Sequence, residues 1–315
     1  MSNSITYYGF ISYYILNGGD RVTKLYICNT STDFISVVNL ESFEEQGRIN
    51  LRSDNSTKIG PHGICRYNGN LLIANSYENT ISLIDVEKEI VINKYFIGIH
   101  CNDVLECNNE AYIICGDSNS LVVFNLITNS IMETISCENH PHSIAVNKEN
   151  KIMVVANMDS DSITLIDCCD RTNIKNVRVG AYPTKAMFTV DGNYILVCES
   201  NIGGDSKGSV AVISLKNCKL IHRISVGSSP VDMYCDQAHC FLSNFGDGTI
   251  SVISLSNYKE LKKLNVGGMP RGIIKNGKYI YVGDNYNNLL IQMDVFGENK
   301  KVIAIGGEPT GMTLI

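Results

Sequence analysis

The chain has 315 residues, of which 44% are hydrophobic and 18% charged, as in an ordinary globular protein. No stretch is apolar enough to span a membrane, and a net charge of −6 without a long basic run gives no support to nucleic-acid binding. The N-terminus has neither the basic segment nor the cleavage site of a signal peptide, so we expect a cytoplasmic protein whose twelve cysteines stay reduced.

A short apolar run followed by a polar turn recurs along the chain. All six prolines mark its start, at Pro61, Pro141, Pro183, Pro230, Pro270 and Pro309. A further copy, CNDVLECNNE, has Asn102 where the others have proline. Proline at the first residue of a strand removes no ladder hydrogen bond, so we interpret each run as a strand that begins at this position.

Three further strands complete each repeated unit. The second strand ends, in chain order, at Asn29, Asn75, Gly116, Asn157, Glu199, Asn244 and Asp284. The third alternates apolar and polar residues, as in TISLIDV and TISVISL, and the fourth is more polar. Units of about 40–45 residues with four strands have the period of a propeller blade. We therefore predict an all-β fold, a single seven-bladed β-propeller domain over residues 1–315 with four antiparallel strands per blade.

The two ends of the chain bear on how the ring closes. An open solenoid is the alternative to a closed ring, but PTGMTLI at residues 309–315 can serve as a ring-closing strand beside KLYICN at residues 24–29. Residues 1–23 are then an extra, tyrosine-rich N-terminal segment. We expect residues 5–16 to be added at an edge or laid across a face.

Two segments, LLIANSYENTISLIDV and VGGMPRGIIKNGKYIYVGDN, carry a family resemblance. They resemble the YVTN-type repeat of seven-bladed β-propellers, in which YVAN, VSVID and VGxxPxGIAV segments recur. The resemblance covers residues 24–315 and implies the fold. It does not imply one function, because such propellers host unrelated activities.

The repeat also explains residues that could be mistaken for functional ones. Cys28, Cys115 and Cys198 fall where other units have alanine, serine or glycine, so we interpret them as small core residues. The asparagines that end second strands suit a strand-to-turn exit, and we interpret them as structural.

Corresponding residues at the start of each first strand are expected to surround one end of a central channel, because the first strand of a blade is innermost. The residues after the proline predict one ring: His62, Asp103, His142, Thr184, Val231, Arg271 and Thr310. The residues before it predict a second: Gly60, Cys101, His140, Tyr182, Ser229, Met269 and Glu308. Lys185 and Asp232 lie one step deeper, and His100 lies close by. The loops after the second strands share this face and are acidic, with Asp33, Glu78, Asp117, Asp159, Asp161, Glu199, Asp205, Asp247 and Asp284. The predicted ligand-binding residues are His62, His100, Asp103, His140, His142, Lys185, Glu199, Asp232, Arg271 and Glu308.

We consider three alternative functions for this channel mouth. The first is a non-catalytic binding or scaffold protein for a small molecule, a peptide or a protein partner. The second is a lyase or hydrolase, as the architectural resemblance to seven-bladed virginiamycin B lyase implies, with His62, His142 and Asp103 as catalytic candidates. The same three side chains are the candidate ligands of a divalent metal ion, the one cofactor that these residue types suggest. The third, nucleic-acid binding, needs a basic face that the acidic loops do not provide.

Overall fold

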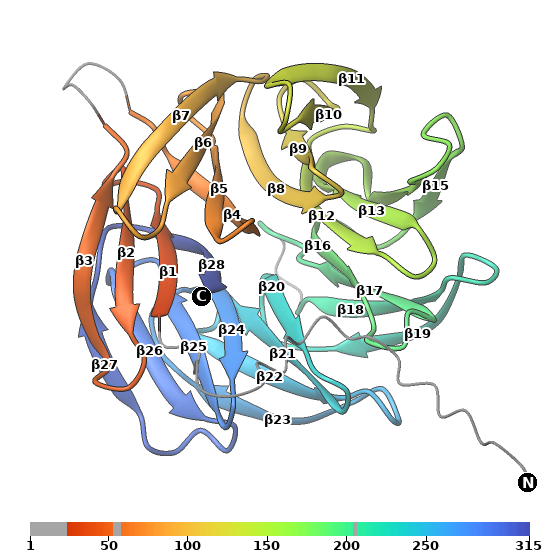
Figure 1. The fold of residues 1–315 in the computed structure, drawn as a ribbon. Helices are drawn as coiled ribbons and strands as arrows, with labels where there is room; N and C mark the ends of the chain where they lie inside the picture. The colour runs from red at the N-terminus through yellow and green to blue at the C-terminus, as the bar shows by residue number, and fades with distance from the viewer. Residues whose placement is uncertain (1–23, 53–57, 204–206) are drawn as a thin grey trace, which may run out of the picture.

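A computed structural model describes residues 24–52, 58–203 and 207–315. In these residues the chain forms seven four-stranded antiparallel sheets arranged around a central axis (Figure 1), which confirms the predicted seven-bladed β-propeller. The extra N-terminal segment, including residues 5–16, and the acidic loop residue Asp205 lie outside the described residues. No helix in the described part of the chain has both the length and the apolar character needed to span a bilayer.

Each blade is numbered by its place in the ring, and its strands run from the axis outward. Blade 1 contains β28 (Pro309–Leu314), β1 (Lys24–Asn29), β2 (Phe34–Asn39) and β3 (Glu44–Asn50). Blade 2 contains β4 (Pro61–Tyr67), β5 (Asn70–Asn75), β6 (Thr80–Asp85) and β7 (Ile90–Phe96). Blade 3 contains β8 (Cys101–Cys107), β9 (Glu110–Cys115), β10 (Ser120–Asn125) and β11 (Ser130–Ser136). Blade 4 contains β12 (Pro141–Asn147), β13 (Ile152–Asn157), β14 (Ser162–Asp167) and β15 (Ile174–Arg178), with a 3-10 turn at Met158–Ser160.

The remaining blades follow the same plan. Blade 5 contains β16 (Pro183–Phe188), β17 (Tyr194–Glu199), β18 (Ser209–Ser214) and β19 (Lys219–Ser225). Blade 6 contains β20 (Pro230–Cys235), β21 (His239–Asn244), β22 (Thr249–Ser254) and β23 (Lys259–Asn265). Blade 7 contains β24 (Pro270–Asn276), β25 (Tyr279–Asp284), β26 (Leu289–Asp294) and β27 (Lys301–Ala304).

Blade 1 is built from both ends of the described chain. The C-terminal strand β28 pairs antiparallel with β1, with Leu314 opposite Leu25 and Met312 opposite Ile27. In Figure 1 the C-terminus accordingly lies near the axis, beside β1. The ring is therefore closed by backbone hydrogen bonds between segments at opposite ends of the sequence.

The hydrophobic core lies between neighbouring blades. Leu72 and Ile81 of blade 2 pack with Ile113 and Val122 of blade 3, and an equivalent cluster fills each of the other blade interfaces. Second and third strands are buried on both faces, whereas fourth strands such as β7 are largely exposed. A single blade could not cover its own faces, so the ring folds as one unit.

Buried polar side chains join strands within each blade. The Nδ2 atom of Asn75 donates hydrogen bonds to Thr80 Oγ1 at 2.9 Å and to Ser82 Oγ at 2.8 Å. Asn157 and Asn244 repeat this pattern in blades 4 and 6. This confirms that these asparagines are structural. Cys28, Cys115 and Cys198 are fully buried, as the core interpretation predicts.

Candidate functional site

The strand register places the third blade one residue away from its predicted alignment. Cys101 pairs with Cys115 as Pro61 pairs with Asn75, so Cys101 occupies the proline position and Asn102 follows it. The second strand of this blade accordingly ends at Cys115 and not at Gly116. The sequence analysis placed Asp103 in the same ring as His62 and His142, and this is wrong. Asp103 lies one step deeper in the channel. The correct alignment follows from counting seven strand residues back from the Asn108 turn, as in blade 2 from the turn at Asn68.

Three sets of equivalent residues surround the channel at this end, and we name them from the outside inward. The rim residues precede the innermost strands: Gly60, His100, His140, Tyr182, Ser229, Met269 and Glu308. The mouth-ring residues come second in those strands: His62, Asn102, His142, Thr184, Val231, Arg271 and Thr310. The deep-ring residues come third: Gly63, Asp103, Ser143, Lys185, Asp232, Gly272 and Gly311.

A local irregularity of the innermost strands directs the mouth ring inward. In β4 the pairing shifts between Pro61 and Gly63, and in β12 it shifts between Pro141 and Ser143, which leaves His62 and His142 as the extra residues of β-bulges. The same shift occurs at the start of the innermost strand in the other blades. Bulges of this kind redirect a side chain that would otherwise follow the pleat.

Glycines in the deep ring let the innermost strands approach closely. A Cβ atom on Gly272 would lie 1.9 Å from the carbonyl oxygen of Thr310, and one on Gly311 would lie 2.4 Å from that of His62. Any larger residue at these two positions would push β24, β28 and β4 apart. The channel is therefore narrow enough for side chains two blades apart to meet.

His62 and His142 meet in this way, and the protein fixes both imidazoles. Their ring centroids lie 5.7 Å apart with the planes nearly perpendicular. His62 Nδ1 lies 2.7 Å from the carbonyl oxygen of Asn102, and His142 Nδ1 lies 2.8 Å from that of Thr184. Because a carbonyl only accepts, each Nδ1 carries the hydrogen and each Nε2 a lone pair. The Nε2 of His62 accepts a hydrogen bond from Arg271 Nη2 at 3.0 Å.

The surroundings keep both histidines neutral. Burial, and next the positive charge of Arg271, hold the pKa of His62 well below its ordinary value. The same two causes lower the pKa of His142 to about 3. Burial also lowers the pKa of Arg271, although a guanidinium remains charged at any physiological pH. The mouth ring therefore contains one fixed positive charge and two neutral imidazoles.

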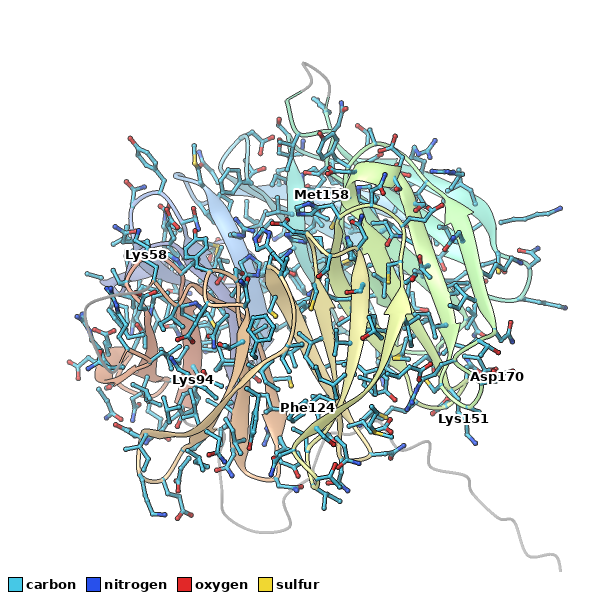
Figure 2. The ribbon with its side chains drawn as sticks, turned by 90° about the horizontal axis from the view of Figure 1, so that it is seen from above. Lys58, Lys94, Phe124, Lys151, Met158 and Asp170 are labelled. Atoms are coloured by element: carbon cyan, nitrogen blue, oxygen red, sulfur yellow. The ribbon has the colours of Figure 1, made fainter. Side chains whose placement is uncertain are left out.

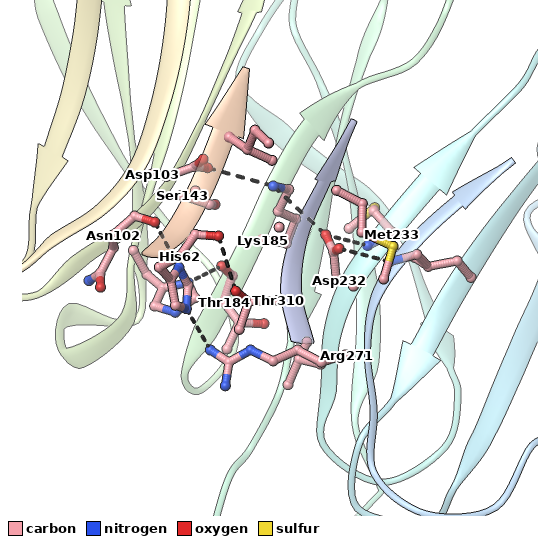
Figure 3. Close-up of a pocket in the computed structure, with 18 of the residues that line it drawn as sticks. His62, Asn102, Asp103, Ser143, Thr184, Lys185, Asp232, Met233, Arg271 and Thr310 are labelled. Atoms are coloured by element: carbon pink, nitrogen blue, oxygen red, sulfur yellow. Dashed lines mark hydrogen bonds and ion pairs between the residues drawn. The ribbon is translucent and has the colours of Figure 1, made fainter. Parts of the chain in front are cut away.

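The deep ring contains a cluster of charged side chains with a net negative charge. Lys185 lies between two carboxylates, with its Nζ 3.6 Å from Asp103 Oδ2 and 3.7 Å from Asp232 Oδ1. Burial opposes the charge of Lys185, but Asp103 and Asp232 raise its pKa above the ordinary value. Burial raises the pKa of Asp232 despite the nearby ammonium group. Figure 3 shows Lys185 between the two aspartates, with His62 and Arg271 at the mouth.

Two cavities with several lining residues in common occupy this end of the channel. The inner one, of about 220 Å³, is lined by both rings and includes His62, Asp103, Lys185, Asp232 and Arg271. The outer one, of about 340 Å³, is lined by His62, His100, His140, His142, Arg271 and Glu308, among others. In the side view of Figure 2, Met158, which also lines the outer cavity, lies toward one face and Asp170 toward the other. Nine of the ten predicted ligand-binding residues thus line one or both cavities.

Glu199 is the exception, and its place in the ligand site was predicted wrongly. Its side chain is buried and accepts two hydrogen bonds from Arg223, at 2.7 Å and 2.9 Å, and one from the backbone amide of Gly180 at 2.6 Å. It occupies the strand-end position of Asn75 in its own blade and serves the same structural purpose. Asp33 and Asp284, also predicted as acidic loop residues of this face, are buried too.

The structure separates the three predicted metal ligands. Asp103 is engaged by Lys185, whereas His62 and His142 lie at the mouth beside Arg271. Within the described residues, one group of three histidine or acidic side chains has its ligand atoms within 4.8 Å of one another: His100, Asp117 and His140. Asn102 and Asp117 were not predicted as ligand-binding residues. Asn102 was missed because of the alignment error, and Asp117 because it is one of many acidic residues in the loops of this face.

The fold and the cavities define a seven-bladed β-propeller with a polar channel mouth. A scan against known protein families finds no match, and no curated protein matches the sequence. Among solved structures, a hydrazine synthase of Kuenenia stuttgartiensis is similar with a TM-score of 0.71 and 15% identity, over 94% of this chain and 99% of that one. A functionally unknown protein from Desulfotomaculum acetoxidans gives a TM-score of 0.74 and 16% identity, over 93% and 98% of the two chains.

A third similar structure is longer than this chain. The dihydro-heme d1 dehydrogenase NirN, in complex with DHE, aligns with a TM-score of 0.66 and 16% identity over 89% of this chain, which spans 63% of NirN. Identities of this size show the shared fold alone.

Proposed function

We propose that this chain is a non-catalytic binding protein, built from YVTN-type repeats, that holds a small anionic molecule at the mouth of its central channel. The YVTN assignment is supported by the two motif segments and by the proline position that six blades share. The binding assignment is supported by the mouth ring.

The proposed anion binding depends mainly on Arg271. Arg271 lines both cavities. Among the described residues no carboxylate lies within ion-pair distance of its guanidinium, which donates a hydrogen bond to the neutral imidazole of His62. Asp232 and Glu308 act on its pKa only from farther away. A partly buried positive charge without a direct counter-charge is costly, and an anion in the outer cavity would relieve that cost.

Other groups at the mouth suit the same ligand. The buried Nδ2 of Asn102 has no hydrogen-bond partner among the described residues, and Asn102 lines both cavities. A buried amide donor of this kind gains about 1–3 kcal/mol when a partner is supplied. A planar carboxylate or a phosphate can accept from the guanidinium and from such a neighbouring donor at the same time.

The chemistry of His142 favours binding over the lyase or hydrolase alternative. His142 is positioned as a base, with Nδ1–H fixed and Nε2 bearing the lone pair, but its pKa is lowered to about 3. A general base works best when its pKa lies near the operating pH. Asp103, the acidic catalytic candidate, is already engaged by Lys185.

Differential calorimetry and titration calorimetry test the proposal. At pH 7 and low ionic strength, we expect at least one member of a panel of phosphate, malonate, citrate and phosphoglycerate to bind with 1:1 stoichiometry and to raise the melting temperature. Arg271→Met should abolish binding, and Arg271→Lys should weaken it because the planar fork is lost. Arg66→Met, at the far end of the blade 2 inner strand, is the matched control and should bind normally. Absence of binding across the panel, or equal binding by Arg271→Met, would contradict the proposal.

A further inference from the structure

Two rim histidines are held in a backbone conformation that is uncommon for non-glycine residues. His100 has a φ of 61° and His140 a φ of 51°, and the equivalent residue in blade 2 is Gly60. An asparagine of the preceding blade fixes each backbone amide: His100 N donates to Asn79 Oδ1 at 2.8 Å, and His140 N donates to Asn119 Oδ1 at 2.8 Å. The same type of hydrogen bond therefore fixes the backbone of both histidines in adjacent blades.

The two imidazoles converge on a shared carboxylate. Their ring centroids lie 5.7 Å apart with the planes at 88°. The Nδ1 atoms of His100 and His140 lie 3.0 Å and 3.9 Å from Asp117 Oδ1. Asp159 Oδ2 lies 3.7 Å from His140 Nδ1, and it occupies in blade 4 the position, two residues past the second strand, that Asp117 occupies in blade 3.

We propose that His100, Asp117 and His140 bind a divalent transition-metal ion of the zinc type, with Asp159 as a neighbouring carboxylate that completes the site. The ligand atoms of the first three already lie within 4.8 Å of one another. A tetrahedral zinc site with nitrogen and oxygen ligands needs them about 3.3 Å apart. Side-chain rotations close this gap, because the side chains are only partly buried, with 32% of His100 and 53% of Asp117 exposed.

The local charge favours a dication. Two carboxylates and two imidazoles gather at this point of the rim, and the ion pairs of Asp117 and Asp159 within the described residues are with these histidines alone. By contrast, His62 and His142 lie beside Arg271, which would repel a cation. Imidazole ligands select zinc, nickel, copper or cobalt over magnesium and calcium, which prefer oxygen ligands only.

The rim site is separate from the anion site in its residues. None of its ligands belongs to the mouth ring, so Arg271→Met should leave metal binding intact. The two sites nevertheless share a cavity, because His100 and His140 line the same outer cavity as Arg271.

Metal titration of the chelator-stripped, reduced protein tests the inference. We expect Zn²⁺ to bind at one ion per chain by calorimetry and to raise the melting temperature. Co²⁺ should give the visible absorption of a four- or five-coordinate site without the intense near-ultraviolet bands of thiolate ligands, which separates this site from the twelve cysteines. His100→Asn and His140→Asn should each weaken Zn²⁺ binding at least about tenfold.

Asparagine is the chosen replacement because it tolerates positive φ, so the backbone of the variants is preserved. His239→Asn is the matched control, since His239 begins a second strand of blade 6 beside Asp236 and is not part of the rim. It should bind Zn²⁺ as tightly as the unmodified chain. Failure to bind one equivalent of Zn²⁺, equal affinity in the rim variants, or thiolate bands with Co²⁺ would each overturn the inference.

Discussion

Arg271 Nη2 donates a hydrogen bond to His62 Nε2 over 3.0 Å, and this contact joins blade 7 to blade 2 across the strand that closes blade 1. His62 and His142 likewise meet from blades that are two apart, as do Lys185 and Asp103. Contacts across the channel therefore link blades that are not neighbours in the ring.

Acid should destabilise the fold through the mouth-ring histidines. An ordinary histidine has a pKa near 6.5, and that of folded His142 is about 3. Between these values the unfolded chain binds a proton that the folded chain does not, so stability falls as the pH drops from about 6.5 toward 3, by up to about 1.4 kcal/mol per pH unit for each such histidine.

The variant His142→Asn isolates this effect, because the asparagine amide nitrogen is attached to Cγ, as Nδ1 is, and can still donate to the Thr184 carbonyl but does not titrate. Urea unfolding at pH 7 and pH 4.5 should show a smaller loss of stability in the variant than in the unmodified chain. An identical loss in both proteins would show that His142 titrates normally.

Removing the ammonium group from the deep ring should destabilise the protein. Lys185→Met leaves Asp103 and Asp232 facing each other in the channel without a counter-charge, and we expect a loss of about 2–3 kcal/mol at pH 7. Denaturant titration measures it. The double variant Lys185→Met/Asp232→Asn should recover part of the loss; if it is less stable than the single variant, the charge explanation fails.

The buried asparagines should matter more for stability than exposed polar residues on the outer strands. Asn75→Ala removes the donors to Thr80 and Ser82 and leaves a small cavity, so we expect a loss of about 2–3 kcal/mol in urea unfolding. Thr134→Ala, on the exposed strand β11, is the control and should change stability by less than about 0.5 kcal/mol. Equal effects of the two substitutions would contradict the structural assignment of Asn75.

Ring closure should depend on the C-terminal strand. A chain that stops at Glu308 lacks β28 and exposes the edge of β1, including Leu25 and Ile27, which are fully buried in the intact ring. We expect aggregation or a melting temperature lowered by more than 10 °C, about what a loss of a few kcal/mol produces in a chain of this length. A synthetic peptide of residues 306–315 should restore part of the stability. A truncated chain that melts like the intact one would contradict closure by β28.

The positions of most candidate site residues could be predicted from local sequence pattern, and the wrong predictions also have local causes. Proline at a strand start identified the innermost strands in six blades, so His62, His142, Lys185, Asp232 and Arg271 were placed correctly around the channel. Blade 3 has no proline to mark the register, and its sequence was therefore aligned with Asn102 at the proline position. This error of one residue placed Asp103 in the mouth ring instead of the deep ring. Glu199 was misplaced because an acidic residue after an apolar strand looks the same in sequence whether it faces solvent or pairs with a buried arginine.

The sequence by itself determined the number of blades, the order of the strands and the residue types that reach the channel, because these follow from a repeat whose period is set by backbone geometry. Only the tertiary structure decided which side chains touch. The partnership of Lys185 with both aspartates, and of His100 and His140 with Asp117, depends on the width of the channel and on bulges in its inner strands. Those are products of packing between blades that are distant in the chain, and no local pattern encodes them.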